Sequence, residues 1–156
     1  MMLYIIKNPK GDTIMEHSRK QLKISSYLVL LFAAISLIEV IAALIFEDFG
    51  AGGEATANVV MITKIIIMAV TVIFLIPQVY VGVKGLKIAN NPNSSKTHIT
   101  WATVLFVFSV VSLIAPIMGF INKSGSDNVR SLLGLLLEAT IYLEYIIEAK
   151  KVAEGK

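Results

Sequence analysis

The sequence predicts an all-α membrane protein, a bundle of four transmembrane helices with both termini in the cytoplasm. Of its 156 residues, 56% are hydrophobic and only 16% are charged, whereas a soluble domain has about 45–50% apolar residues. The apolar residues gather in four long runs separated by short polar segments. The distribution of Lys and Arg around these runs predicts the orientation.

Each apolar run is close to the length that a helix needs to cross a membrane. About 30 Å of hydrocarbon requires roughly 20 helical residues. The expected spans are residues 24–46, 59–83, 99–121 and 131–147. Together they form a transmembrane domain, 24–147, between the cytoplasmic segments 1–23 and 148–156. The fourth span is the shortest and carries Glu138 and Glu144, so a tilted or partly interfacial fourth helix stays open as an alternative.

Basic residues cluster at the ends that we assign to the cytoplasm. They precede the first span (Lys7, Lys10, Arg19, Lys20, Lys23), follow the second (Lys84, Lys87, Lys96) and follow the fourth (Lys150, Lys151, Lys156). The connection after the first span has no Lys or Arg, and the one after the third has only Lys123 and Arg130. This asymmetry predicts a multi-pass protein of the plasma membrane, and it explains the net charge of +3 without nucleic-acid binding.

The start of the chain leaves two alternatives. Residues 1–14 do not resemble a structural element, whereas the segment that begins Met15-Glu16-His17 is typical of a membrane-protein start, so translation from Met1 and from Met15 both stay open. The first apolar run is longer than the core of a cleavable signal peptide, and we therefore expect the first helix to be retained.

Small and polar residues follow one face of each expected helix, which indicates the face that turns toward the other helices. The second helix has Lys64, Met68, Thr71, Leu75, Gln78 and Gly82 at spacings of four and three, and the fourth has Ser131, Gly134, Glu138, Tyr142 and Tyr145. We expect an intramembrane polar site made of Glu39, Lys64, Thr71, Gln78, Glu138 and Tyr142. Helix packing alone would explain the same stripes.

The ionisable members of this site matter most, because charge at membrane depth is costly and is usually paired, solvated or functional. Glu39 and Lys64 lie at similar depth on adjacent antiparallel helices. They either form an ion pair, or Lys64 extends to the outer headgroups. Glu138 lies near the bilayer middle, where it is either neutral and hydrogen-bonded to Tyr142, Thr71 or Ser109, or binds a proton reversibly.

Catalytic and metal-binding motifs are absent from the sequence. It has no cysteine, its two histidines, His17 and His98, fall in expected cytoplasmic segments, and no phosphate loop or nucleophile elbow is present. We therefore expect no enzyme, no metal and no cofactor. Pro116 is expected to mark a kink in the third helix.

The second and third spans meet in a segment with a family resemblance. Residues 79–89 (VYVGVKGLKIA) and 94–99 (SSKTHI) resemble the central hairpin of small, uncharacterised four-helix membrane proteins of Gram-positive bacteria. This resemblance covers about a third of the chain and implies a bacterial cell-membrane location, but no activity. Small multidrug transporters also have four helices and a carboxylate in the first, which Glu39 matches in kind.

Two main hypotheses follow for the function. The first is a non-catalytic component that packs with a second copy or with a partner membrane protein. The second is a small proton- or cation-coupled transporter that uses Glu39 and Glu138, and an intramembrane enzyme ranks third. Partner binding predicts a polar stripe that the chain leaves uncovered, whereas transport predicts a cavity that joins Glu39 or Glu138 to one surface.

Overall fold

A computed structural model describes residues 9–46, 57–91, 96–121 and 127–155, and these residues form helices without any strand. The helices are α1 (Pro9–Phe46), α2 (Ala57–Asn90), α3 (Thr97–Ser112), α4 (Ile114–Ile121) and α5 (Asp127–Glu154). Within this part of the chain, three segments are long and apolar enough to cross a membrane: Met15–Ile45, Val59–Asn90 and Thr97–Gly119. The expectation of an all-α membrane protein is therefore confirmed.

The helix α5 differs from these three segments because charged residues interrupt its apolar positions, among them Glu138, Glu144 and Glu148. This agrees with the weaker signal of the fourth expected span. The helix nevertheless packs along both α1 and α3, so it is an integral part of the fold.

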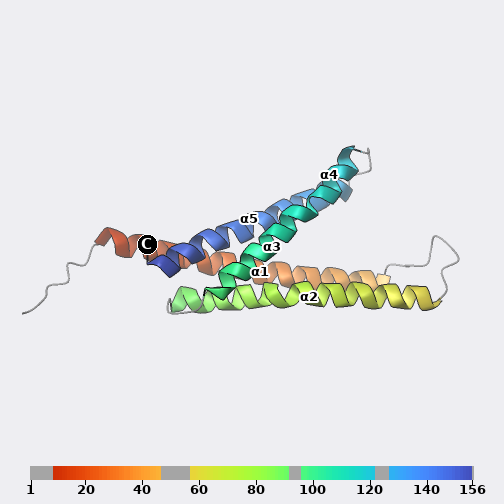
Figure 1. The fold of residues 1–156 in the computed structure, drawn as a ribbon, viewed down its shortest axis with the longest axis horizontal. Coiled ribbons are helices and arrows are strands. Elements are labelled where there is room, and N and C mark those ends of the chain that lie inside the picture. Colours follow the sequence, from red (N-terminus) through yellow and green to blue (C-terminus); the bar gives the residue numbers. More distant parts are fainter. Residues whose placement is uncertain (1–8, 47–56, 92–95, 122–126, 156) are drawn as a thin grey trace, which may run out of the picture.

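The helices form two arms that diverge from one another (Figure 1). Helices α1 and α2 run antiparallel, side by side, while α3, α4 and α5 form a second antiparallel arm that crosses the first at an angle. The arms meet where α1 begins, α2 ends and the C-terminus lies. We call this half of the molecule the packed half, and the half toward α4 and the start of α2 the open half.

Three of the helices extend beyond the expected spans. Helix α1 begins at Pro9, α2 continues to Asn90 and α5 continues to Glu154. The added segments are rich in Lys, Glu, Gln and Ala, which are good helix formers, so the helices continue where the apolar runs stop. The expected hairpin between the second and third spans is confirmed, since α2 ends at Asn90 and α3 begins at Thr97.

Pro116 explains the interruption between α3 and α4. Proline has no backbone N–H, so Pro116 cannot donate to the carbonyl oxygen of Ser112, the last residue of α3. Instead, the N–H of Leu113 bonds to the carbonyl oxygen of Val110 at 3.2 Å, and the helix resumes at Ile114. The kink expected at Pro116 is therefore confirmed.

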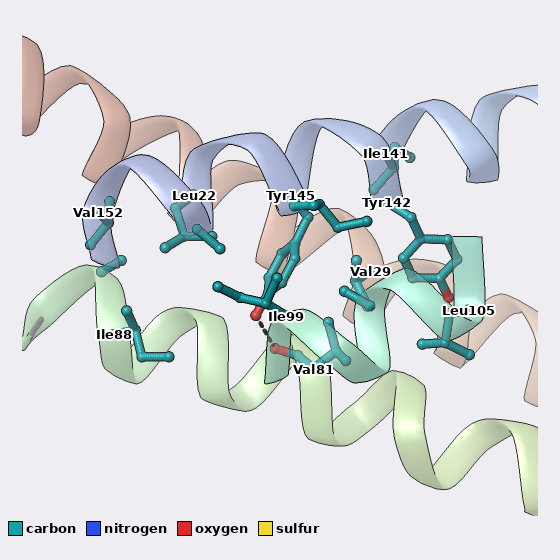
Figure 2. Close-up of a cluster of buried hydrophobic side chains, with 14 residues drawn as sticks. Leu22, Val29, Val81, Ile88, Ile99, Leu105, Ile141, Tyr142, Tyr145 and Val152 are labelled. Carbon is teal, nitrogen blue, oxygen red and sulfur yellow. Dashed lines mark hydrogen bonds between the residues drawn. The ribbon is translucent and has the colours of Figure 1, made fainter. Parts of the chain in front are cut away.

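The hydrophobic core lies in the packed half (Figure 2). Its buried side chains include Leu22 and Val29 of α1, Val81 and Ile88 of α2, Ile99 and Leu105 of α3, and Ile141, Tyr142, Tyr145 and Val152 of α5. The Tyr145 hydroxyl donates to the carbonyl oxygen of Val81 at 2.9 Å. Toward the open half, most large apolar side chains of α2 are exposed, as expected of a surface that lipid covers.

Close helix contact in this core depends on two glycines of α2. A Cβ atom at Gly82 would lie 2.5 Å from Leu30 Cγ, and one at Gly85 would lie 2.5 Å from Tyr145 Cε2. Both positions therefore need a residue without a side chain. Small residues that allow helix backbones to approach are a common feature of membrane helix interfaces.

Candidate functional site

The two arms enclose a hollow where they begin to separate. It consists of three cavities of about 520, 240 and 220 Å³, and Ser36 of α1 lines all three. The largest is lined by both carboxylates of the expected site, Glu39 and Glu138, and by Arg130 at the start of α5. Because the three cavities share lining residues, we treat them as one site, the carboxylate cleft.

Glu138 is held in this cleft by side chains of three helices. Gln78 Nε2 of α2 donates to Glu138 Oε1 at 3.4 Å, and the hydroxyl groups of Ser109 of α3 and Tyr142 of α5 lie beside the carboxylate. Ser109 and Gln78 also line the smallest cavity together with Glu138. The carboxylate therefore faces several polar groups in an otherwise apolar part of the molecule.

Two buried polar atoms next to Glu138 make no hydrogen bond. They are Oε1 of Gln78, whose side chain is 8% exposed, and the hydroxyl group of Tyr142, which is 1% exposed. Leaving a buried polar group unpaired costs about 1–3 kcal/mol, and native proteins avoid it or use it for function. Gln78 Oε1 thus remains an acceptor beside the carboxylate, and the Tyr142 hydroxyl lies within reach of both Glu138 and Gln78.

Glu39 forms the opposite wall of the cleft. Its side chain is exposed, and it lines the two larger cavities. Thr71 faces one of these cavities, while its hydroxyl donates to the carbonyl oxygen of Ile67 in its own helix at 2.9 Å. Glu39 therefore has room for a ligand or water at its carboxylate.

Lys64 does not line any of the three cavities of the cleft. Its Nζ donates to the carbonyl oxygen of Leu44 at 2.9 Å. The Glu39–Lys64 ion pair, one of the two alternatives, therefore stays a prediction. Lys64 reaches along the α1–α2 contact toward the end of α1, where unpaired helix carbonyls accept hydrogen bonds from cations.

The structure thus brings together Glu39, Thr71, Gln78, Glu138 and Tyr142 and leaves Lys64 apart. The sequence analysis did not assign Arg130 or Ser36 to the site. Ser36 lies three residues before Glu39, so both are on one face of the first helix. The pairing of Gln78 with Glu138 depends on the angle between the arms, for which the sequence has no signal.

The cleft ends at the hydrophobic core. Tyr142 and Leu105 are both buried at this boundary, and beyond them Tyr145 packs edge-on against His98, with ring centroids 6.1 Å apart. Figure 2 shows Tyr142 and Leu105 together at one end of this buried cluster.

Among the described residues, no group of three His, Asp or Glu side chains comes together as a metal site would require. Comparisons of the chain with family models, curated proteins and solved structures find no match. The chemistry of the site therefore has to be argued from the side chains of this chain.

Proposed function

We propose that the protein is a small cation-coupled membrane transporter whose carboxylate cleft binds a proton or another cation. The observation that carries this proposal is that Glu39 of α1 and Glu138 of α5 line one cavity of about 520 Å³ from opposite arms. Helices that only pack against one another need no such pair of carboxylates, whereas a site that binds and releases cations does.

The proposed orientation places both termini in the cytoplasm, with α5 as the fourth span. It rests on the excess of Lys and Arg at the packed half and on the resemblance of the α2–α3 hairpin to small bacterial membrane proteins. The cleft then opens to the outer side. Glu39 lies seven residues before the end of α1, and Glu138 lies eleven residues after the start of α5. At 1.5 Å per residue, these carboxylates would lie about 10 and 16 Å from the outer ends of their helices.

Carboxylates at such depth need a counter-charge, water or a proton, because an unpaired charge in hydrocarbon costs several kcal/mol. Arg130 lines the same cavity and offsets one of its two carboxylates. A proton or a bound cation would offset the other, and the two exclude each other. The Gln78 amide group holds the carboxylate in place, the free Oε1 of Gln78 can ligate a cation, and the Tyr142 hydroxyl can donate to the carboxylate when no cation is bound.

The packed half would act as the closed side of a transport cycle. In this proposal the buried side chains of Tyr142, Leu105 and Tyr145 would separate the cleft from the cytoplasm. Transport would require a second state in which the two arms rock about the packed half, as in other transporters that alternate access around a fixed site.

Difference infrared spectroscopy on the protein in lipid tests the proposal. Adding Na⁺ or tetraphenylphosphonium at constant pH should remove a carboxylic-acid C=O band, because a bound cation displaces the proton. The band change should be reduced in Glu39→Gln and in Glu138→Gln. The matched control is Glu144→Gln, which removes a carboxylate of the same helix that does not line the cleft, and it should respond like the wild type. No band change with either cation would refute the proposal.

A second candidate function is helix association, and the uncovered part of α5 favours it. Ser131 and Gly134 are exposed, and a Cβ atom at Gly134 would meet no atom within 4 Å. A helix of a second copy could fill this space and cover the polar stripe. Disulfide crosslinking of Gly134→Cys in native membranes tests this, with Val107→Cys on α3 as the control, since the chain has no natural cysteine.

A further inference from the structure

A second polar hollow lies in the packed half, on the α1–α2 pair. It has a volume of about 420 Å³ and is lined by Glu16, Arg19, Lys20 and Lys23 of α1 and by Ala89 and Asn90 of α2. Three cations face one carboxylate, so the hollow carries a net charge of +2. We call it the basic cleft.

Among the described residues, the cations of the basic cleft exceed the single carboxylate that lines it. Arg19 Nη2 contacts Met15 Sδ at 3.2 Å, while Arg19 Nε is buried and makes no hydrogen bond. Within the described residues, none of Arg19, Lys20 and Lys23 takes part in an ion pair. Positive charge that only orients the protein in the membrane needs neither a hollow nor a buried arginine N–H without an acceptor. An anionic ligand would supply that acceptor.

An apolar groove of about 600 Å³ lies on the same pair of helices. It is lined by Leu37 of α1 and by residues of α2 that include Val72, Ile76, Val79 and Val83. Its only charged residue is Lys84, whose Nζ lies 5.9 Å from the centre of the Tyr80 ring, at the end nearer the basic cleft. The groove can hold a hydrocarbon chain, and Lys84 places positive charge near its head.

Helix geometry places the groove and the basic cleft on one face. Asn90 follows Val83, Val79, Ile76 and Val72 by 7, 11, 14 and 18 residues, each close to a whole number of turns. Lys23 and Leu37 are likewise 14 residues apart on α1. This face turns away from the side of α1 that packs on α5, where Leu22 and Val29 are buried.

The dimensions fit a phospholipid. From Asn90 to Val79 the helix rises about 16 Å, and half of the hydrocarbon thickness of a bilayer is about 15 Å. Lys23 immediately precedes the apolar run that begins at Ile24, so the basic cleft lies at the level of the headgroups. A phosphate in the basic cleft would therefore have its acyl chain beside the groove.

We propose that this face of the α1–α2 pair binds an anionic phospholipid, with the phosphate in the basic cleft and one acyl chain in the apolar groove. The net charge of +2 favours an anionic headgroup over a zwitterionic one. The apolar groove on the same face of the helix pair favours a lipid over free phosphate. This inference is independent of the cation chemistry proposed for the carboxylate cleft.

Native mass spectrometry of the full-length protein in detergent tests the proposal. The ligands are phosphatidylglycerol, phosphatidylcholine with the same acyl chains, and inorganic phosphate. Arg19→Gln/Lys23→Gln removes two charges of the basic cleft, and the control Lys96→Gln/Lys150→Gln removes two exposed charges elsewhere. Each charge removed from the basic cleft should weaken phosphatidylglycerol binding about fivefold, or about 25-fold for both, with little effect in the control.

The groove is tested separately by Val79→Trp, which fills it, against Val107→Trp on the exposed face of α3. Val79→Trp should weaken phosphatidylglycerol binding and leave the fold intact, so this variant still tests the proposal if the charge variants fold poorly. Equal binding of phosphatidylglycerol and phosphatidylcholine, or equal losses in both charge variants, would overturn it. Competition by inorganic phosphate at the affinity of phosphatidylglycerol would show a phosphate site and overturn the lipid assignment.

Discussion

Replacing Gly85 by alanine probes the closest contact of α1, α2 and α5. The added Cβ atom would lie 2.5 Å from Tyr145 Cε2 and 2.8 Å from the Tyr145 hydroxyl oxygen, and it would also contact Ser26 Oγ. Tyr145 and Ser26 are fully buried, so neither side chain can turn into open space. Either the helices separate, or Tyr145 moves and loses its 2.9 Å hydrogen bond to the Val81 carbonyl oxygen.

The expected loss of stability follows from these contacts. Overpacking a core costs about 1–3 kcal/mol, and a buried hydroxyl group that loses its partner adds about 1–3 kcal/mol. Alanine recovers up to about 1 kcal/mol because it is a better helix former than glycine. We therefore expect Gly85→Ala to lower the free energy of unfolding by about 3 kcal/mol, a factor of about 150 in the equilibrium constant.

Unfolding by dodecyl sulfate in mixed micelles, followed through the fluorescence of the single tryptophan, Trp101, measures this loss. Gly134→Ala is the matched control, because its Cβ meets nothing within 4 Å, and it should be as stable as the wild type or slightly more stable. In Tyr145→Phe the hydroxyl is already absent, so adding Gly85→Ala should cost less than it does in the wild type. If Gly85→Ala unfolds like Gly134→Ala, the close contact of these helices is refuted.

Three further predictions concern other parts of the structure. Gly82→Ala should cost less than Gly85→Ala, about 1–2 kcal/mol in the same assay, because its closest neighbour is the flexible side chain of Leu30; an equal or larger loss would contradict this. Ala102→Leu should lower stability by about 1–3 kcal/mol, since Ala102 is 0% exposed, and thermal unfolding that matches the wild type would show spare room there. A membrane-impermeant maleimide should label Arg130→Cys in intact cells and Lys150→Cys only after permeabilisation; labelling of both from one side would show that α5 does not cross the membrane.

Much of the fold could be predicted because lipid imposes simple rules on sequence. A backbone in hydrocarbon must form helices, so the apolar runs before Phe46 and after Val59 indicated α1 and α2 directly. The turn formers between Asn90 and Thr97 likewise marked the hairpin. The helix ends were less predictable, because the helices continue into polar segments that contact neighbouring helices instead of lipid.

The sequence could predict which face of each helix the site residues occupy, but not which residues of different helices meet. The spacing of residues along a helix decides which way each one turns, and Gln78 and Tyr142 both lie beside Glu138 in the structure. Pairing across helices depends also on helix order and crossing angle. Lys64, for example, bonds to a backbone carbonyl, an acceptor that every residue offers and that leaves no pattern in a sequence.

Because the arms diverge, stripes of small and polar residues have different roles in the two halves of the molecule. In the packed half, the small residues Gly82 and Gly85 let the helices touch, and the chain fills its own interior. In the open half, Gly134 and Ser36 line a hollow because the arms have separated. The carboxylates of the stripes are confined to that half, at Glu39 and Glu138, where the chain leaves them room. In the proposed function a proton or cation occupies this hollow, because it offsets the carboxylates with the fewest additional groups.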